Sequence, residues 1–141
     1  MNAISLWQPW ASAISVGLKS IETRSWAPPV SAIGQPLAIC AAKRNTPDLR
    51  AWWVENVVHN GEHSSAFARF ELREWEDLPF GKVVATARLY AVCSTSADPP
   101  PEGVPLNSDF LWGDFSPGRF AWFLDNIEPL ETPVPVVGRQ G

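Results

Sequence analysis

Charge, cysteine and histidine are all scarce in this sequence, and each scarcity excludes a class of function. Charged residues make up 18% of the chain and the formal net charge is −4, so the protein does not coat a nucleic acid by charge alone. The two cysteines lie far apart inside apolar runs, and the two histidines flank the helix-breaking Gly61, so neither pair has the spacing of metal ligands. We therefore expect no metal and no other cofactor, and we expect two reduced thiols in a cytoplasmic protein.

Long apolar segments are lacking too. No uncharged run approaches the roughly 18 residues of a membrane-spanning helix. The N-terminus has no basic segment of the kind that begins a signal peptide. We therefore expect no membrane association. No heptad pattern or internal repeat points to a particular oligomeric state.

Tryptophan, proline and apolar residues are, by contrast, plentiful. The hydrophobic share is 45%, with Trp 8 and Pro 14 among the 141 residues. This length predicts one domain over residues 1–141 with a core of its own. Proline excludes long uninterrupted helices and central strands at its positions, so we expect short elements joined by ordered loops.

Apolar runs and turn residues predict five or six strands and two or three helices. The strands are expected at residues 3–6, 21–26, 36–42, 83–93 and 118–124, with an edge strand at 131–137. The helices are expected from Pro9 to Gly17, from Thr46 to about Asn60 and, more weakly, before Pro79. Because strands and helices do not alternate regularly, we expect an α+β, mainly β fold, in which helices flank a small curved sheet or barrel.

One short stretch of mixed charge stands out at residues 17–26. If residues 21–26 form a strand, Glu22 and Arg24 lie on the same face, about 6.5–7 Å apart. Lys19 precedes them, directly after a glycine that can end a helix. The residues alone leave two interpretations open: a solvated strand edge, or a polar cluster at the floor of a cleft.

Positive charge is concentrated in the N-terminal third of the chain. Residues 1–50 carry a local charge of +3, although the whole chain is acidic. Two of these cations, Lys43 and Arg44, follow the apolar run at 36–42, so a strand there would end with them at the rim of the fold. This third of the chain is therefore the better candidate for binding an anion.

Three stretches of the sequence resemble the ASCH family, the activating-signal-cointegrator homology domains of the PUA-like β-barrels. Residues 5–11 (SLWQPWA) lead into residues 17–24, which match the family pattern G-x-K-x-x-E-x-R. Residues 118–122 (GRFAW) and 133–141 (PVPVVGRQG) are the other two. Together these stretches span nearly the whole chain, and the first is the most specific.

The resemblance implies a small PUA-like β-barrel with a cleft lined by Lys19, Glu22 and Arg24. Such clefts are proposed to bind RNA or other nucleic acid, and some family members have nuclease or modified-nucleoside amidohydrolase activity. The amidohydrolase-type relatives carry threonine where this chain has Glu22. A hydrolytic mechanism that depends on this threonine is therefore in doubt here.

Our first hypothesis is a cleft that binds single-stranded RNA or a nucleotide-like small molecule. Lys19 and Arg24 would contact phosphate, and Glu22 would accept a hydrogen bond from a base edge. Trp7 and Trp112 would stack on bases. The complete set of expected ligand-binding residues is Trp7, Gln8, Lys19, Glu22, Arg24, Lys43, Trp112 and Arg119.

Two alternatives belong to other functional classes, because the fold does not fix the chemistry. In a metal-free hydrolase (a ribonuclease or a modified-nucleoside amidohydrolase), Lys19 and Glu22 would be the catalytic pair. Lys19 would stabilise an oxyanion or move a proton, and Glu22 would activate water. In a protein-interaction module, the proline-rich residues 97–105 would form the contact surface.

Overall fold

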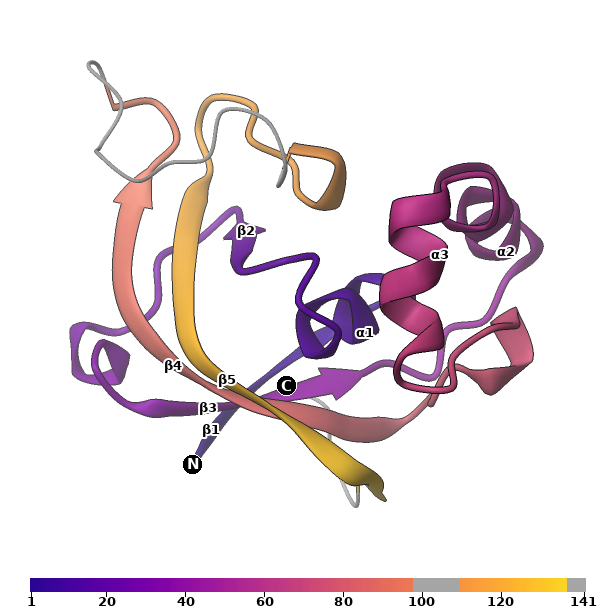
Figure 1. Ribbon diagram of the computed structural model, residues 1–141. Helices are drawn as coiled ribbons and strands as arrows, with labels where there is room; N and C mark the ends of the chain where they lie inside the picture. Colours follow the sequence, from indigo (N-terminus) through magenta and orange to yellow (C-terminus); the bar gives the residue numbers. More distant parts are fainter. Residues whose placement is uncertain (98–109, 137–141) are drawn as a thin grey trace.

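A curved five-stranded sheet forms the frame of the protein (Figure 1). The computed structural model describes residues 1–97 and 110–136. Its strands are β1 (Asn2–Leu6), β2 (Ile21–Arg24), β3 (Pro36–Ala41), β4 (Lys82–Ser94) and β5 (Phe120–Pro135). The strand order is β1-β3-β4-β5-β2; β1 and β3 are parallel, and the other neighbouring pairs are antiparallel.

The two longest strands, β4 and β5, give the sheet its curvature. Their pairing changes register at three places along β4, and such bulges bend and twist a strand pair. The sheet curls into a half-barrel with β1 and β2 at its two edges (Figure 1). The α+β, mainly β class and the barrel-like, PUA-like architecture expected from the sequence are confirmed.

The late strands differ from the prediction. Most of the two segments expected separately at 118–124 and 131–137 belongs to the single strand β5, which runs from Phe120 to Pro135. Residue 137 lies outside the described residues. This is possible because β4 is long enough to pair from Lys82 with Pro135 up to Ser94 with Phe120. Between the pairs Ala85–Pro129 and Val83–Val134, four β5 residues stand opposite the single residue Val84, and this bulge accommodates the proline-rich sequence there.

Helix α1 (Trp10–Ser15) lies in the concave side of the sheet and links two cores (Figure 1). Ala11 and Ile14 belong to the core cluster formed with the sheet. Ala13, on the opposite side, belongs to a second cluster rich in aromatic rings, including Trp53 and Trp112. A short alanine-rich helix suits this position because its small side chains permit close approach on both faces.

A second layer of helices covers the other side of α1. It consists of α2 (Pro47–Trp53), a π-helical stretch (Val54–Val58) and α3 (Gly61–Ala68). The Thr46 side chain caps α2 by accepting from the Leu49 N–H, and the Asn60 side chain accepts a hydrogen bond from the His63 N–H at the start of α3. The weakly predicted helix before Pro79 corresponds to α3, which begins at Gly61 after this cap and already ends at Ala68.

Three further observations concern expectations from composition. No helix in the described part of the chain is long and apolar enough to cross a membrane. Cys40 and Cys93 are both free, and burial raises the pKa of each thiol. Among residues 1–97 and 110–136, no group of three or more His, Cys, Asp and Glu side chains could hold a metal ion.

Candidate ligand-binding site

The edge strand β2 positions the two charged side chains that the strand pattern singled out. Glu22 pairs with Trp122 and Arg24 with Phe120 across the antiparallel β2–β5 ladder, so the two side chains share one face. Glu22 Oε2 lies 3.1 Å from Arg24 Nε, and Arg24 Nη2 donates to the Ser5 carbonyl at 2.7 Å. Arg24 Nε has no hydrogen-bond partner among the described residues. Its contact with Glu22 Oε2 is therefore an ion pair and not an aligned hydrogen bond.

Lys19 is a buried positioning residue behind this pair. Its exposed fraction is 1%, and its ammonium donates to the Ile21 carbonyl at 2.7 Å and to the Trp112 carbonyl at 2.6 Å. The same nitrogen lies 3.2 Å from Glu22 Oε1. One side chain therefore ties β2 to the segment around Trp112, which is 93 positions further along the chain.

Glu22 is bracketed by cations and nearly buried. Lys19 approaches Oε1, Arg24 approaches Oε2, and Oε1 also accepts from the Thr23 N–H at 3.0 Å. The exposed fraction of the residue is 8%. These contacts hold the carboxylate in one orientation.

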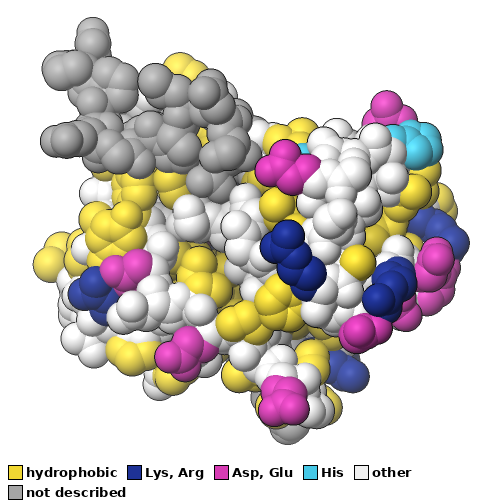
Figure 2. Space-filling model, viewed as in Figure 1, with side chains coloured by type: hydrophobic (Ala, Val, Ile, Leu, Met, Phe, Trp, Pro, Cys, Tyr) yellow, Lys and Arg dark blue, Asp and Glu magenta, His cyan; other side chains and the backbone are white. Residues whose placement is uncertain are grey.

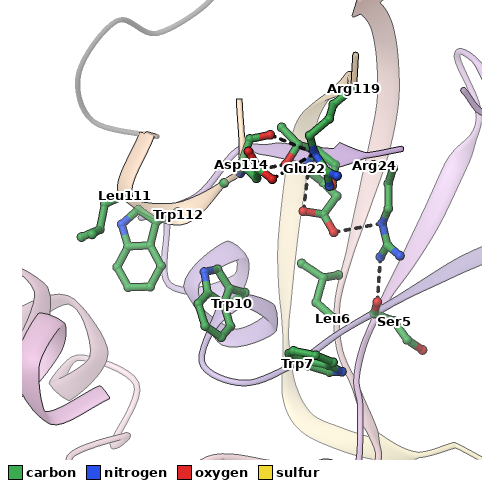
Figure 3. A pocket seen from close by; sticks show the side chains of 12 residues that line it. Ser5, Leu6, Trp7, Trp10, Glu22, Arg24, Leu111, Trp112, Asp114 and Arg119 are labelled. Carbon is green, nitrogen blue, oxygen red and sulfur yellow. Dashed lines mark hydrogen bonds and ion pairs between the residues drawn. The ribbon is translucent and has the colours of Figure 1, made fainter. Parts of the chain in front are cut away.

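A cavity of about 620 Å³ opens in front of these groups (Figure 3). Polar side chains gather along one wall, and the indole rings of Trp7, Trp10 and Trp112 lie along the other. Trp52 of α2 supports this aromatic wall, with ring centroids 4.7 Å from Trp10 and 5.3 Å from Trp112. The lining residues are Ser5, Leu6, Trp7, Trp10, Glu22, Thr23, Arg24, Leu111, Trp112, Gly113, Asp114 and Arg119.

Asp114 and Arg119 complete the polar wall from the far end of the chain. Thr23 Oγ1 accepts from the Asp114 N–H at 3.0 Å, which anchors this segment to β2. Arg119 donates to the Thr23 carbonyl at 3.2 Å and lies 3.6 Å from the Asp114 carboxylate. The Ser116 hydroxyl, 2.6 Å from Asp114 Oδ1, is the main cause of the lowered pKa of this carboxyl. Asp114 is therefore ionised at neutral pH.

The Ser116→Ala variant tests this cause directly. We expect the pKa of Asp114 to rise towards its ordinary value, although the Ser116 N–H bond at 3.0 Å remains and keeps part of the lowering. Because the folded-state pKa is depressed, the stability that Asp114 contributes is present above its ordinary pKa and is lost as the pH falls through the depressed value. Carbon-13 NMR titration of the side-chain carboxyl measures the change. An unchanged pKa would show that the hydroxyl is not the cause.

The structure brings together five of the eight residues predicted to bind a ligand. Trp7, Glu22, Arg24, Trp112 and Arg119 all line the cavity, although they come from three separate stretches of the sequence. Trp7 is 50% exposed, so it is available for contact, whereas Trp112 is 1% exposed and is mainly a core residue with one side at the cavity.

The other three predicted residues do not line the cavity. Lys19 lies behind Glu22, as described above. Gln8 is fully buried, and its amide bonds Ser12 and the Pro79 carbonyl at 2.7–3.0 Å, so it fixes the start of α1. Lys43 is exposed, but its stem packs close to Gly81 on the other side of β3.

Several lining residues were missed by the sequence analysis. Trp10 falls within the helix expected from Pro9 to Gly17, and as the first residue of α1 it also lies against the cavity. Asp114 lies two residues after the aromatic turn at residues 110–112, and a polar residue so close to such a turn was a usable signal. Leu6 had no signal, because an apolar strand residue is expected in the core.

A second cavity, of about 880 Å³, lies on another part of the surface. It is bounded by the segment that follows α3 and by β4 and β5, and it includes Arg69, Phe70 and Lys82. None of the predicted site residues lines it. The first cavity is therefore the candidate site.

The comparison with protein families decides the classification. The family model for the ASCH domain matches residues 4–97, which is more than half of the chain. The chain belongs to the ASCH domain family. The matched range contains Lys19, Glu22 and Arg24, whereas Asp114 and Arg119 lie beyond it.

Solved structures similar to this ASCH domain come from Zymomonas mobilis. The crystal structure of an ASCH protein from that organism is 18% identical, with coverage of 95% of this chain and 72% of that chain and a TM-score of 0.49. A point mutant of the same protein is 19% identical, with coverage of 94% and 72% and a TM-score of 0.50. At this identity the likeness to the mutant shows a shared fold and nothing more. No curated protein matches the sequence.

Proposed function

We propose that this ASCH domain binds a nucleobase of single-stranded RNA, or of a nucleotide-like small molecule, in the cavity described above. The observation that carries the proposal is the composition of that cavity: an indole wall faces two carboxylates and two guanidinium groups across about 620 Å³. Pockets of a few hundred Å³ suit ligands of nucleotide size. The proposal includes a cytoplasmic location, in keeping with two free thiols.

The balance of charge in the cavity favours a base over a phosphate chain. Glu22 and Asp114 carry negative charge, and Arg24 and Arg119 carry an equal positive charge. On the face drawn in Figure 2, acidic and basic side chains are interspersed, without a basic patch. A polar, planar and neutral group suits such a site, because its donors can meet carboxylates and its acceptors can meet guanidinium N–H groups.

Single-stranded or splayed RNA fits this proposal better than a duplex. The bases of a duplex are stacked and paired, and the deep major groove of A-form RNA does not admit side chains. An unstacked base can instead lie against an indole ring and present its edge to the polar wall. Trp7, which is half exposed at the mouth of the cavity, is the ring best suited to this contact.

The two alternatives from the sequence have less support. In the hydrolytic alternative Glu22 faces the cavity, but Lys19 does not line it and its ammonium is occupied by two carbonyls and Glu22. The proline-rich surface of the protein-interaction alternative lies almost wholly in residues 98–109, outside the described residues. Binding is therefore the function that we favour.

Titration with nucleosides and short single-stranded RNAs tests the proposal. We expect the affinity for RNA to fall only weakly with salt, with a slope that corresponds to about one to three phosphates. A slope for six or more phosphates would contradict a small local site.

The Glu22→Gln variant tests the recognition group itself. It keeps the shape of the side chain and removes its charge, so we expect about tenfold weaker binding. Glu128→Gln is the matched control, because Glu128 is exposed on β5 and does not line the cavity. Equal affinities for Glu22→Gln and wild type would contradict the proposal.

A further inference from the structure

Trp7 lies between the cavity and a cation that does not belong to the cavity. The guanidinium carbon of Arg44 is 4.3 Å from the centroid of the Trp7 ring, within the range of a cation–π contact. Trp7 lines the cavity, whereas Arg44 does not. The indole ring therefore separates the base site from an exposed arginine at its rim.

The sheet topology explains why these two residues meet. β1 and β3 are parallel neighbours in register, with Leu6 opposite Ala41, and the Ala42 N–H donates to the Leu6 carbonyl at 2.9 Å. The chain therefore leaves both strands at the same edge, where Trp7 follows β1 directly and Arg44 comes three residues after the end of β3. Lys43, directly before Arg44, leans towards Gly81 instead.

The charge of Arg44 is available to a ligand. Within residues 1–97 and 110–136, Arg44 makes no ion pair and no side-chain hydrogen bond. Arg24 and Arg119, by contrast, are engaged with carboxylates and backbone carbonyls. Stacking over an indole fixes the plane of a guanidinium and leaves its N–H groups at the edge free to donate.

We propose that Arg44, held over Trp7, is a phosphate-binding subsite beside the base cavity. The inference rests on the proposed function and names its substrate class: the ligand is a nucleotide unit, whose base enters the cavity and whose phosphate meets Arg44. A guanidinium offers phosphate two parallel hydrogen bonds. The cavity itself has no net charge to attract a phosphate, and Arg44 supplies the missing cation at its rim.

Calorimetric titration of four nucleosides and of their 5′- and 3′-monophosphates tests this subsite. For the nucleoside that wild type prefers, we expect one of the two phosphates to improve the affinity about tenfold. In Arg44→Gln, which keeps a planar group over Trp7 but removes the charge, this gain should fall to about twofold or less while the affinity for the nucleoside is kept.

A single-stranded tetranucleotide is titrated alongside. Tighter binding of the tetranucleotide than of the monophosphate identifies RNA as the source of the phosphate, and equal binding identifies a free nucleotide.

Arg69→Gln is the matched control, because Arg69 is an exposed arginine that lines the second cavity. It removes the same charge, and the gain from phosphate should survive in it. If wild type binds nucleosides but phosphate adds nothing, or if the gain survives in Arg44→Gln, the subsite is wrong and the base cavity stands. If wild type binds no nucleoside, nucleotide or tetranucleotide, the proposed function itself fails and the subsite fails with it.

Discussion

Lys19→Ala is expected to lower the free energy of unfolding by about 3–5 kcal/mol, because it removes one partner of a buried ion pair. The Lys19 side chain is fully buried, and its ammonium lies 3.2 Å from Glu22 Oε1. After the substitution, the Ile21 and Trp112 carbonyls would also lose a donor at 2.7 and 2.6 Å. A buried acceptor without a partner carries its full desolvation cost.

Thermal and urea-induced unfolding, followed by tryptophan fluorescence, measures this loss. Lys43→Ala is the control, because Lys43 is exposed and makes no ion pair among the described residues, so its effect should stay within about 0.5 kcal/mol. The experiment also separates two roles of Lys19. If Lys19→Ala were as stable as wild type but lost its ligand, Lys19 would be a direct ligand contact, as the sequence pattern suggested, and not a positioning residue.

The sequence predicted the part of the site that depends on local geometry. Alternation along a strand places Glu22 and Arg24 on one face, and in the structure Arg24 Nε lies 3.1 Å from Glu22 Oε2. The burial of Lys19 could not be predicted in this way. It depends on the Trp112 carbonyl, which the folded sheet brings to Lys19 from 93 positions away. No pattern within one segment contains that information.

The choice between Lys43 and Arg44 shows a second limit of sequence reasoning. The strand pattern predicted a basic pair at the rim, and the structure has both residues exposed there. Both residues lie beyond the end of β3 at Ala41, where the alternation of a strand no longer fixes the directions of side chains. The strand pattern therefore could not tell that Arg44, and not Lys43, meets Trp7.

The continuity of β5 was missed for a related reason. The polar residues around Asp125 and the prolines beyond them read as an interruption of the strand. Pairing with β4 carries the strand through, and bulges absorb the residues that do not fit the ladder. The fold class survived this error because it depends on the order of strands and helices along the chain, not on whether one strand is divided.

Trp7→Ala is the variant with the largest expected effect on binding. Base stacking on an aromatic side chain contributes about 1–3 kcal/mol per base, so the affinity for a single-stranded tetranucleotide should fall roughly 5- to 150-fold. The protein should remain folded, because half of the Trp7 side-chain surface is already exposed. The loss should also appear with a nucleoside that lacks phosphate, which distinguishes stacking from the charge effect of Arg44.

Trp26→Ala provides an unusually close control for this variant. Trp26 is 49% exposed, against 50% for Trp7, and its ring packs edge-on against Trp122 with centroids 4.9 Å apart. It does not line the cavity. Both variants remove the same half-exposed indole, so a general effect of lost aromatic surface would weaken binding equally in the two. We expect the affinity of Trp26→Ala to stay within about twofold of wild type, because stacking needs a ring that faces the base. Equal losses in both variants would mean that Trp7 is not the stacking platform, and the base would then have to lie elsewhere.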